Sequence, residues 1–377
     1  MALNQLGLGM LFSATDLASG VMGKIRNGFN QTADGAGKFS ASSKSAFKEF
    51  GLGLGIMTAG VAGLAMLDPA LKAAGDFGAA IAETSTLIDE ATFPVSEMTR
   101  LTMGLAATYG KMAPEEVKAL YQGISAGASD ASKATGLLNA ANKLAIGGVT
   151  DVKTSVDGLT NVLNSYGIAY EGATDVSDAF FVAIKAGKTT VAELASTVGR
   201  LAPTAGAVGV GFEQMLAAVS AVTTKGLKTE EAINGLKAAL SNVIKPTSDA
   251  VAEAKRLGIE FTAESLRAKG LPKFLNEITS SSKFNADSMS KLFGSIEGLN
   301  SILALTANGS ATFTDILGSM GKRTGETDRA FEKMANTSKF QGERFDALKN
   351  NALILIGQAI SPFKVAILKA ANAILDG

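Results

Sequence analysis

Histidine, cysteine and tryptophan are all absent from this chain of 377 residues. Without histidine and cysteine there is no Ser-His-Asp or Cys-His nucleophile pair, no zinc site built from those ligands and no disulfide framework. The chain has 35 lysine and arginine residues and 35 aspartate and glutamate residues. It therefore lacks the net positive charge that favours binding to nucleic acid. We therefore expect no cofactor, no metal and no specific nucleic acid partner. The missing cysteine leaves the compartment open.

Adjacent carboxylates occur at Glu115-Glu116 and at Glu230-Glu231, and a pair of carboxylates is what a glycosidase needs. Each pair follows a helix-start residue, Pro114 or Thr229, where negative side chains complement the helix dipole. The glycines of Gly209–Phe212 lack the preceding strand, the third glycine and the lysine of a phosphate-binding loop. We interpret both acidic pairs as helix starts and predict that the protein is not an enzyme.

The stretch from Gly187 to Gly258 predicts several short helices with clear starts and stops. Thr190 with Glu193 three residues later is a capping box, and Pro203 must lie beyond the end of that helix. The next helix has an apolar stripe and a glycine C-cap: Phe212, Leu216, Val219, Val222 and then Gly226. The helix after it begins at Thr229 and has its own buried stripe, a proline stop and a restart: Ile233, Leu236, Leu240, Pro246 and Thr247 or Ser248. Leu257-Gly258 ends the following helix.

Similar signals predict helices in most of the remaining chain. Further starts are expected at Pro94, Pro114, Thr150-Asp151 and Thr174-Asp175. Glycines are expected at helix ends at positions 127, 136, 187, 226, 258 and 270. After Gly321 we expect one long helix or two in series, ended by Pro362, and then a last apolar helix over Phe363–Leu375. The predicted fold class is all-α, with many short helices in a compact or solenoid-like domain.

Several segments follow one another in a specific order along the chain. They are Leu201-Ala202-Pro203, Gly209–Glu213, Lys225–Ala232, Leu236–Leu240, the Lys-Pro at 245–246 followed by Leu-Gly-Ile at 257–259, Lys291–Gly294 and Ala330–Met334. No single one of these motifs is specific, but their order resembles the core of phage tail tape-measure proteins. The resemblance covers roughly Ala73 to Pro362.

This resemblance implies a structural protein that assembles inside the tail tube, sets its length and is expelled ahead of the DNA. It implies contacts with the tail tube protein, with tail assembly chaperones and with baseplate hub or tip proteins. The implied location is the lumen of the virion tail, after assembly in the host cytoplasm.

The first part of the chain has a different pattern. Leu6, Leu8, Met10 and Phe12 alternate with other residues, which predicts a short N-terminal strand. Apolar residues at intervals of four from Leu17 to Phe29 then predict an amphipathic helix, followed by a polar linker. No secretory signal is evident, since a charged start and a cleavable apolar core are missing.

Phe50–Leu67 contains no charged residue and is rich in glycine. Its small residues recur every four positions at Gly51, Gly55, Ala59 and Gly63, so they line one face of a helix that can approach another helix closely. Three interpretations are open: a self-association helix or buried hairpin in a soluble oligomer, a segment that enters the host inner membrane on ejection, or a constant membrane anchor. The length is at the short end of the spanning range. Self-association would build a small symmetric oligomer of three- or six-fold symmetry.

These patterns predict four parts. Residues 1–46 hold the N-terminal strand, helix and linker, and residues 47–72 the apolar Gly-zipper helix. Residues 73–322 form the helical tape-measure core, and residues 323–377 the long C-terminal helical segment. The alternative function is a membrane-active, pore-forming protein that uses Phe50–Leu67. A peptidoglycan-cleaving enzyme is a third class, for which these residues supply no chemistry.

Overall fold

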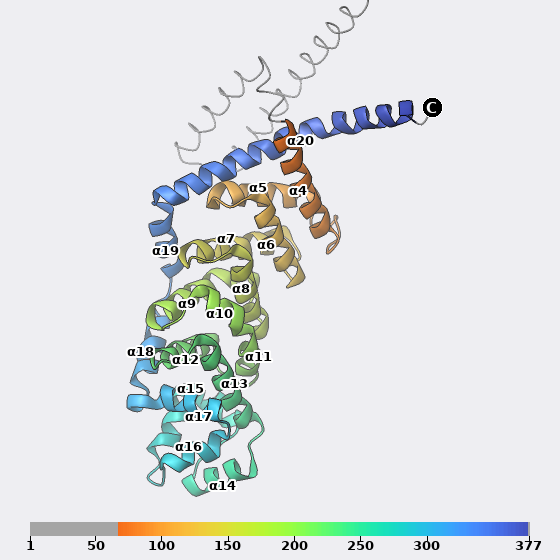
Figure 1. The fold of residues 1–377 in the computed structure, drawn as a ribbon. Coiled ribbons are helices and arrows are strands. Elements are labelled where there is room, and N and C mark those ends of the chain that lie inside the picture. Colours follow the sequence, from red (N-terminus) through yellow and green to blue (C-terminus); the bar gives the residue numbers. More distant parts are fainter. Residues whose placement is uncertain (1–66, 376–377) are drawn as a thin grey trace, which may run out of the picture. The chain divides into compact units, whose positions relative to one another are not determined.

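The computed structural model describes residues 67–375, and every regular element in that range is a helix (Figure 1). This confirms the all-α prediction for the described part of the chain. The predicted strand at Leu6–Phe12, the amphipathic helix after it and most of the Gly-zipper helix lie outside the described residues, so they stay predictions.

The described residues form two compact units. Unit 1 contains the residues up to Val117 and those from Gln341 onward, and unit 2 runs from Lys118 to Phe340. The sequence-based division at residues 47, 73 and 323 stays a prediction.

In unit 1, helix α20 packs against two earlier helices. The unit comprises α4 (Leu67–Ser85), α5 (Val95–Tyr109), the first turn of α6 (Ala113–Ser125) and most of α20 (Ser338–Leu375). The backbones of α4 and α20 touch, because a methyl group placed on Gly357 would lie 2.0 Å from the carbonyl oxygen of Ala70. The Asn351 side-chain amide donates a hydrogen bond to the carbonyl of Met103 on α5 at 2.9 Å. Helix α20 therefore supports both α4 and α5.

The C-terminal helices differ in one respect from the prediction. Two helices in series do follow Gly321, namely α19 (Glu326–Ala335) and α20. The prediction that Pro362 ends the second of these is wrong, because α20 continues through Pro362 to Leu375. Proline removes one backbone hydrogen bond from a helix, but the residues from Phe363 onward are rich in alanine, leucine and lysine. These residues have high helix propensity, so the helix resumes without a break.

Unit 2 is a stack of short helices. Apart from the rest of α6 and the first residues of α20, they are α7 (Ala131–Gly147), α8 (Val152–Tyr166), α9 (Ala173–Ala186), α10 (Val191–Thr197), α11 (Ala202–Ala207), α12 (Phe212–Thr224), α13 (Thr229–Ile244), α14 (Ser248–Leu257), α15 (Ala263–Ser280), α16 (Ala286–Phe293), α17 (Ile296–Thr306), α18 (Ala311–Met320) and α19. Three 3₁₀ turns join them: η1 (Tyr170–Gly172), η2 (Val198–Arg200) and η3 (Ala307–Ser310).

Most predicted starts and stops are confirmed in unit 2. Thr190 and Glu193 form the predicted capping box, in which the Glu193 amide donates to the Thr190 hydroxyl at 3.1 Å. Asp151 and Thr247 cap α8 and α14. Gly258 ends α14 in the left-handed conformation, with φ of 73°. These features depend on residues close in sequence, which is why local pattern predicts them.

Two predicted helix ends are wrong. Helix α9 begins after Gly172 without a side-chain cap, and Thr174-Asp175 lies within its first turn. The Asp175 carboxylate accepts hydrogen bonds from Arg323 instead, so a tertiary contact replaces the expected cap. Gly136 lies inside α7 and does not end it. A glycine in the middle of a helix weakens it but does not stop it.

Helices α18 and α19 turn back along the stack. Figure 1 shows successive layers from α7 and α8 down to α14 and α16, with α18 and α19 running back along one side. Helix α18 packs on α12 and α9, and α19 packs on α9 and α7. The last helices of unit 2 therefore cover some of its first.

Candidate functional sites

The predicted small-residue site comprises Gly51, Gly55, Ala59 and Gly63, and all four lie outside the described residues. Between residues 67 and 375, no helix combines the length and the apolar character needed to cross a membrane. Self-association and membrane insertion through Phe50–Leu67 therefore stay predictions.

The two carboxylate pairs lie where the sequence analysis placed them. Glu115-Glu116 is in the first turn of α6, and Glu230-Glu231 is in the first turn of α13. The Glu231 carboxylate accepts a hydrogen bond from the Lys228 amide at 2.9 Å, and Glu230 pairs with Arg200. Glu116 is fully buried, which the local pattern did not indicate.

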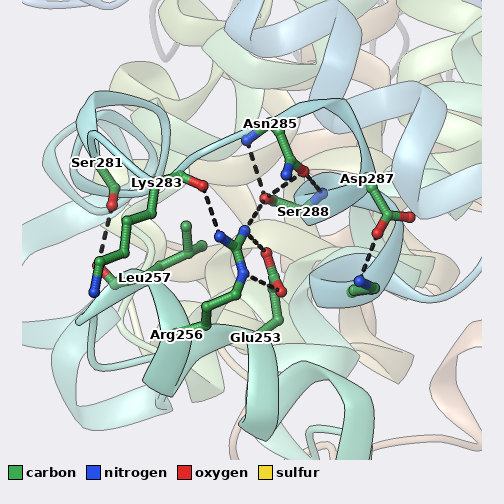
Figure 2. Close-up of polar contacts among 9 residues, drawn as sticks. Glu253, Arg256, Leu257, Ser281, Lys283, Asn285, Asp287 and Ser288 are labelled. Carbon is green, nitrogen blue, oxygen red and sulfur yellow. Dashed lines mark hydrogen bonds and ion pairs between the residues drawn. The ribbon is translucent and has the colours of Figure 1, made fainter.

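A polar cluster in unit 2 joins α14, α16 and the loop between α15 and α16 (Figure 2). Arg256 donates to both oxygens of Glu253, to the Lys283 carbonyl at 2.9 Å and to the Ser288 hydroxyl at 2.9 Å. Ser288 and Asn285 form a capping box at the start of α16, with the Ser288 amide donating to the Asn285 side chain at 3.0 Å. Ser281 also donates to the carbonyl of Leu257 at 3.0 Å.

The electrostatics of this cluster indicate a structural clamp. Hydrogen bonds from Arg256 lower the pKa of Glu253 to about 2, although the carboxylate is only 3% exposed. Glu253 is therefore ionised throughout the neutral range, and a carboxylate of such low pKa is a weak general base. The Ser288 hydroxyl contacts a guanidinium and an amide oxygen, neither of which acts as a general base at neutral pH. The cluster fastens the end of α14 to α16.

A second polar cluster centres on Asp178, a residue of α9 that is 3% exposed. One carboxylate oxygen accepts a hydrogen bond from the Thr327 amide at 2.8 Å, and the other accepts from the Gly325 amide at 2.7 Å. The hydroxyls of Ser177 and Thr327 lie 3.0 Å apart and share a hydrogen bond. Asp178 thus caps α19 from another helix, and its negative charge complements the positive end of the α19 dipole.

Ion pairs surround this cap. Arg323 donates to both oxygens of Asp175 and reaches Glu213 at 3.2 Å, and Asp175 raises the pKa of Arg323. Its guanidinium also lies 5.4 Å from the centre of the Phe212 ring, a cation–π contact.

Two lysines extend these contacts to the rest of α19. Lys185 pairs with Glu326 at 2.7 Å, and Lys143 pairs with Asp328 at 2.7 Å. Hydrogen bonds from Lys185 and Arg329 lower the pKa of Glu326. Helix α19 is thereby tied to both α7 and α9.

The sequence analysis did not identify Asp178 and Thr327 as partners. The available signal was the pair Ser177-Asp178, two polar residues beside the apolar stripe that includes Val176 and Phe180. This signal indicates a buried polar contact but cannot name its partner, which lies 149 residues away.

One small cavity lies inside unit 2. Its volume is about 10 Å³, and it is lined only by apolar side chains: Leu201, Ala205, Val210, Met215, Ala218, Leu236, Leu240, Leu271 and Ile302. It has room for about one water molecule and nothing polar to orient one. Between residues 67 and 375, no group of three or more acidic side chains is placed to hold a metal ion.

Fold and sites together define residues 67–375 as a helical assembly whose polar clusters fasten helices to one another. Residues 99–294 match the family described as phage-related minor tail protein. This match covers just over half of the chain, and the chain belongs to that family.

Two curated relatives agree with this assignment. A probable tape measure protein of Clostridium phage phiCD119 is 28% identical over 326 residues, which cover 83% of this chain and 34% of the relative. The tape measure protein of Pneumococcus phage Dp-1 is 22% identical over 230 residues, which cover 60% of this chain and 20% of the relative. The chain thus matches about a third of the length of the first relative and a fifth of the second. No solved structure matches it.

Proposed function

We propose that this chain is the folded core region of a tail tape-measure protein. The observation that carries the proposal is the similarity of 83% of the chain to a probable tape measure protein. In this role the protein assembles inside the tail tube, governs tail length and assembly, and leaves the tube at genome delivery. Its place is the tail lumen of the virion, after assembly in the host cytoplasm.

The partners that suit this role are the tail tube protein, tail assembly chaperones and baseplate hub or tip proteins. The equal numbers of acidic and basic side chains support contacts with protein over contacts with DNA. The core would extend over residues 73–322, followed by a long helical segment. Pull-down of the tagged chain from infected cells, with mass spectrometry of the captured proteins, tests the partners directly.

A deletion in α20 tests the ruler function. Removing Gly342–Ala359 takes out about 18 residues, which is about five helical turns, so the flanking parts of α20 keep their rotational phase. A protein that measures the tail as extended helix predicts tails about 27 Å shorter, since each helical residue spans about 1.5 Å. Tail length is measured by electron microscopy of phage carrying the deletion.

The other outcomes of the deletion are equally informative. Tails of unchanged length would show that this segment does not measure, and failure to assemble would assign it a docking role. Deleting a similar length from the α14–α15 region, which lies in the folded stack, is the matched comparison. A ruler made of α20 alone predicts that this second deletion leaves no proportional change in length.

A structural role predicts no turnover of peptidoglycan by the purified chain. The proposal rests on the placement of both carboxylate pairs in helix first turns and on the absence of histidine and cysteine. Release of soluble muropeptides, lost in Glu115→Gln or Glu230→Gln, would show that the protein is an enzyme.

Self-association through Gly51, Gly55, Ala59 and Gly63 is a further part of the proposal. Close helix contact through such small residues contributes about 1–2 kcal/mol per favourable contact. Gly55→Leu should weaken the oligomer, while Leu54→Ala in the same segment serves as the control. An unchanged cross-linked oligomer in Gly55→Leu would remove the zipper from the proposal.

Entry of Phe50–Leu67 into the host membrane on ejection is a further part of the proposal, and a membrane-active, pore-forming protein that uses the same segment is the alternative function. Both are supported by the absence of charge in that segment. A peptide of these residues should release dye from liposomes. Met57→Lys should abolish the release, because a charge near the bilayer centre costs about 2.5–3.5 kcal/mol on insertion scales. Equal release from both peptides would exclude this mode of action.

A further inference from the structure

Helices α18 and α19 are held to unit 2 by different kinds of contact. Helix α18 buries Phe313, Ile316 and Met320. In α19, Thr327 is the one buried residue, while Phe331 and Met334 stay partly exposed. The Phe331 ring packs edge-on against Phe340, which lies in the first turn of α20. Apolar burial therefore secures α18 much more than it secures α19.

Polar contacts attach α19 instead. Asp178 accepts both the Gly325 and the Thr327 amide, and Lys143 and Lys185 pair with acidic residues of α19. Charged groups that have access to water form ion pairs of small net stability, because the side chains are well solvated when apart. The Lys185 and Asp328 side chains are 62% and 48% exposed. Much of the attachment therefore depends on two groups, the buried Asp178 carboxylate and the Arg323 guanidinium, which is 17% exposed and pairs with Asp175 and Glu213.

Close packing adds a small apolar contact at one point. A methyl group placed on Gly147 would lie 3.0 Å from the side chain of Ala330. This contact involves the smallest side chains in the chain, so it buries little apolar area. It positions α19 on α7 but contributes little to holding it there.

We propose that residues 322–335 form a clasp that opens as a unit while the rest of unit 2 stays folded. Segments with few buried apolar contacts open locally at lower free energy than the core. Opening would break the Asp178 cap, expose the faces of α7 and α9 that the clasp covers and release the chain that leads into α20. The inference concerns unit 2 alone and holds or fails independently of the proposed tail role. In a tail, the clasp would be the place where the folded core begins to open.

The absence of cysteine allows a clean locking experiment. The Ser177 and Thr327 hydroxyl oxygens lie 3.0 Å apart, so cysteines at both positions bring two sulfurs within reach of a disulfide. The full-length double variant Ser177→Cys/Thr327→Cys then contains one possible disulfide. Its oxidised form locks the clasp onto α9, and its reduced form leaves the clasp free to open.

Hydrogen exchange with mass spectrometry reads out the opening. In the natural protein, amides of residues 326–335 should exchange about tenfold faster than those of α12, corresponding to about 1.4 kcal/mol. Oxidation of the double variant should slow exchange in the clasp about tenfold and leave α12 unchanged. Equal exchange in α12 and the clasp of the natural protein would overturn the proposal.

Two substitutions complete the test. Asp178→Ala should speed exchange in the clasp about tenfold while α12 stays protected, and Asp249→Ala on α14 is the control. If Asp178→Ala exposes all of unit 2 together, the clasp is not a separate unit and the proposal fails. Thr327→Val keeps the shape of the side chain and loses the hydroxyl that bonds to Ser177. It should also speed exchange in the clasp relative to α12, with less disturbance of the fold. No acceleration in either variant would also overturn the proposal.

Discussion

Gly235 of α13 lies against Ser301 of α17. A methyl group placed on Gly235 would come 2.0 Å from the Ser301 hydroxyl oxygen and 2.4 Å from the carbonyl of Glu297. There is no space for another carbon atom between Gly235 and these two atoms of α17, so the backbones of α13 and α17 are in contact here. Glycine in the middle of a helix is unfavourable by itself, and this contact supplies the packing reason for it.

Gly235→Ala should therefore destabilise unit 2 by about 1–3 kcal/mol, because the extra carbon overpacks the contact between α13 and α17. Gly318→Ala on α18 is the matched control, since nothing lies within 4 Å of the added carbon. There, alanine should stabilise by about 0.5–1 kcal/mol through its better helix propensity. Urea unfolding followed by circular dichroism measures both, and a loss of stability in Gly235→Ala no larger than in Gly318→Ala would contradict the packing argument.

Glu253→Gln should destabilise unit 2 by about 1–2 kcal/mol at neutral pH, because it removes the charge that Arg256 pairs with. The loss is moderate because the Arg256 side chain is 42% exposed and can find water. Asp287→Asn in the neighbouring surface pair with Lys291 is the control and should change stability by less than about 0.5 kcal/mol. Urea unfolding gives the free energy of unfolding of the natural protein, Glu253→Gln and Asp287→Asn, which are then compared.

The lowered pKa of Glu253 also predicts how the free energy of unfolding depends on pH. The pKa of Glu253 is about 2 in the folded protein, against an ordinary value of 4.5. The ionised carboxylate therefore stabilises the fold fully above pH 4.5, and this contribution is lost as the pH falls toward 2. The difference in unfolding free energy between the natural protein and Glu253→Gln should be constant near neutrality and shrink in acid. A difference that stays constant down to about pH 3 would show that the lowered pKa is wrong.

Val149 has a strained backbone conformation. It follows α7 with φ of 54°, a left-handed conformation that is rare for a branched side chain, and the side chain is 76% exposed. The Thr150 amide donates to the carbonyl of Ala145 at 2.9 Å, which closes the helix end and imposes this conformation. Glycine is the usual residue at a left-handed helix end, but here the glycine is one position earlier, at Gly148. Gly148 is needed there because a side chain would clash with Val191.

Val149→Gly should accordingly stabilise unit 2 by about 0.5–1 kcal/mol, since the left-handed conformation costs an ordinary residue about 1–2 kcal/mol and glycine loses part of that gain as chain entropy. Val251→Gly is the control, because Val251 is also exposed but lies inside α14. That substitution should destabilise by about 0.5–1 kcal/mol. Thermal unfolding of the two variants should shift in opposite directions, and a shift of both in the same direction would exclude the strain.

The sequence by itself determined the features of this protein that depend on near neighbours. The capping box of Thr190 and Glu193, the stop before Pro246 and the left-handed end at Gly258 were all predictable, because each involves residues within one helical turn. The order of such segments also indicated the family, which the match over residues 99–294 then confirmed.

The tertiary structure alone decided which helices meet and what polar side chains do there. Asp175 looked like a helix cap and instead binds Arg323, 148 residues away. Asp178 caps a helix that begins almost 150 residues later, and Gly235 serves a contact with α17. Such partners are set by the packing of the whole stack. A buried carboxylate or an interior glycine shows that a close partner is needed, but the free energy that selects the partner comes from apolar burial spread over many helices.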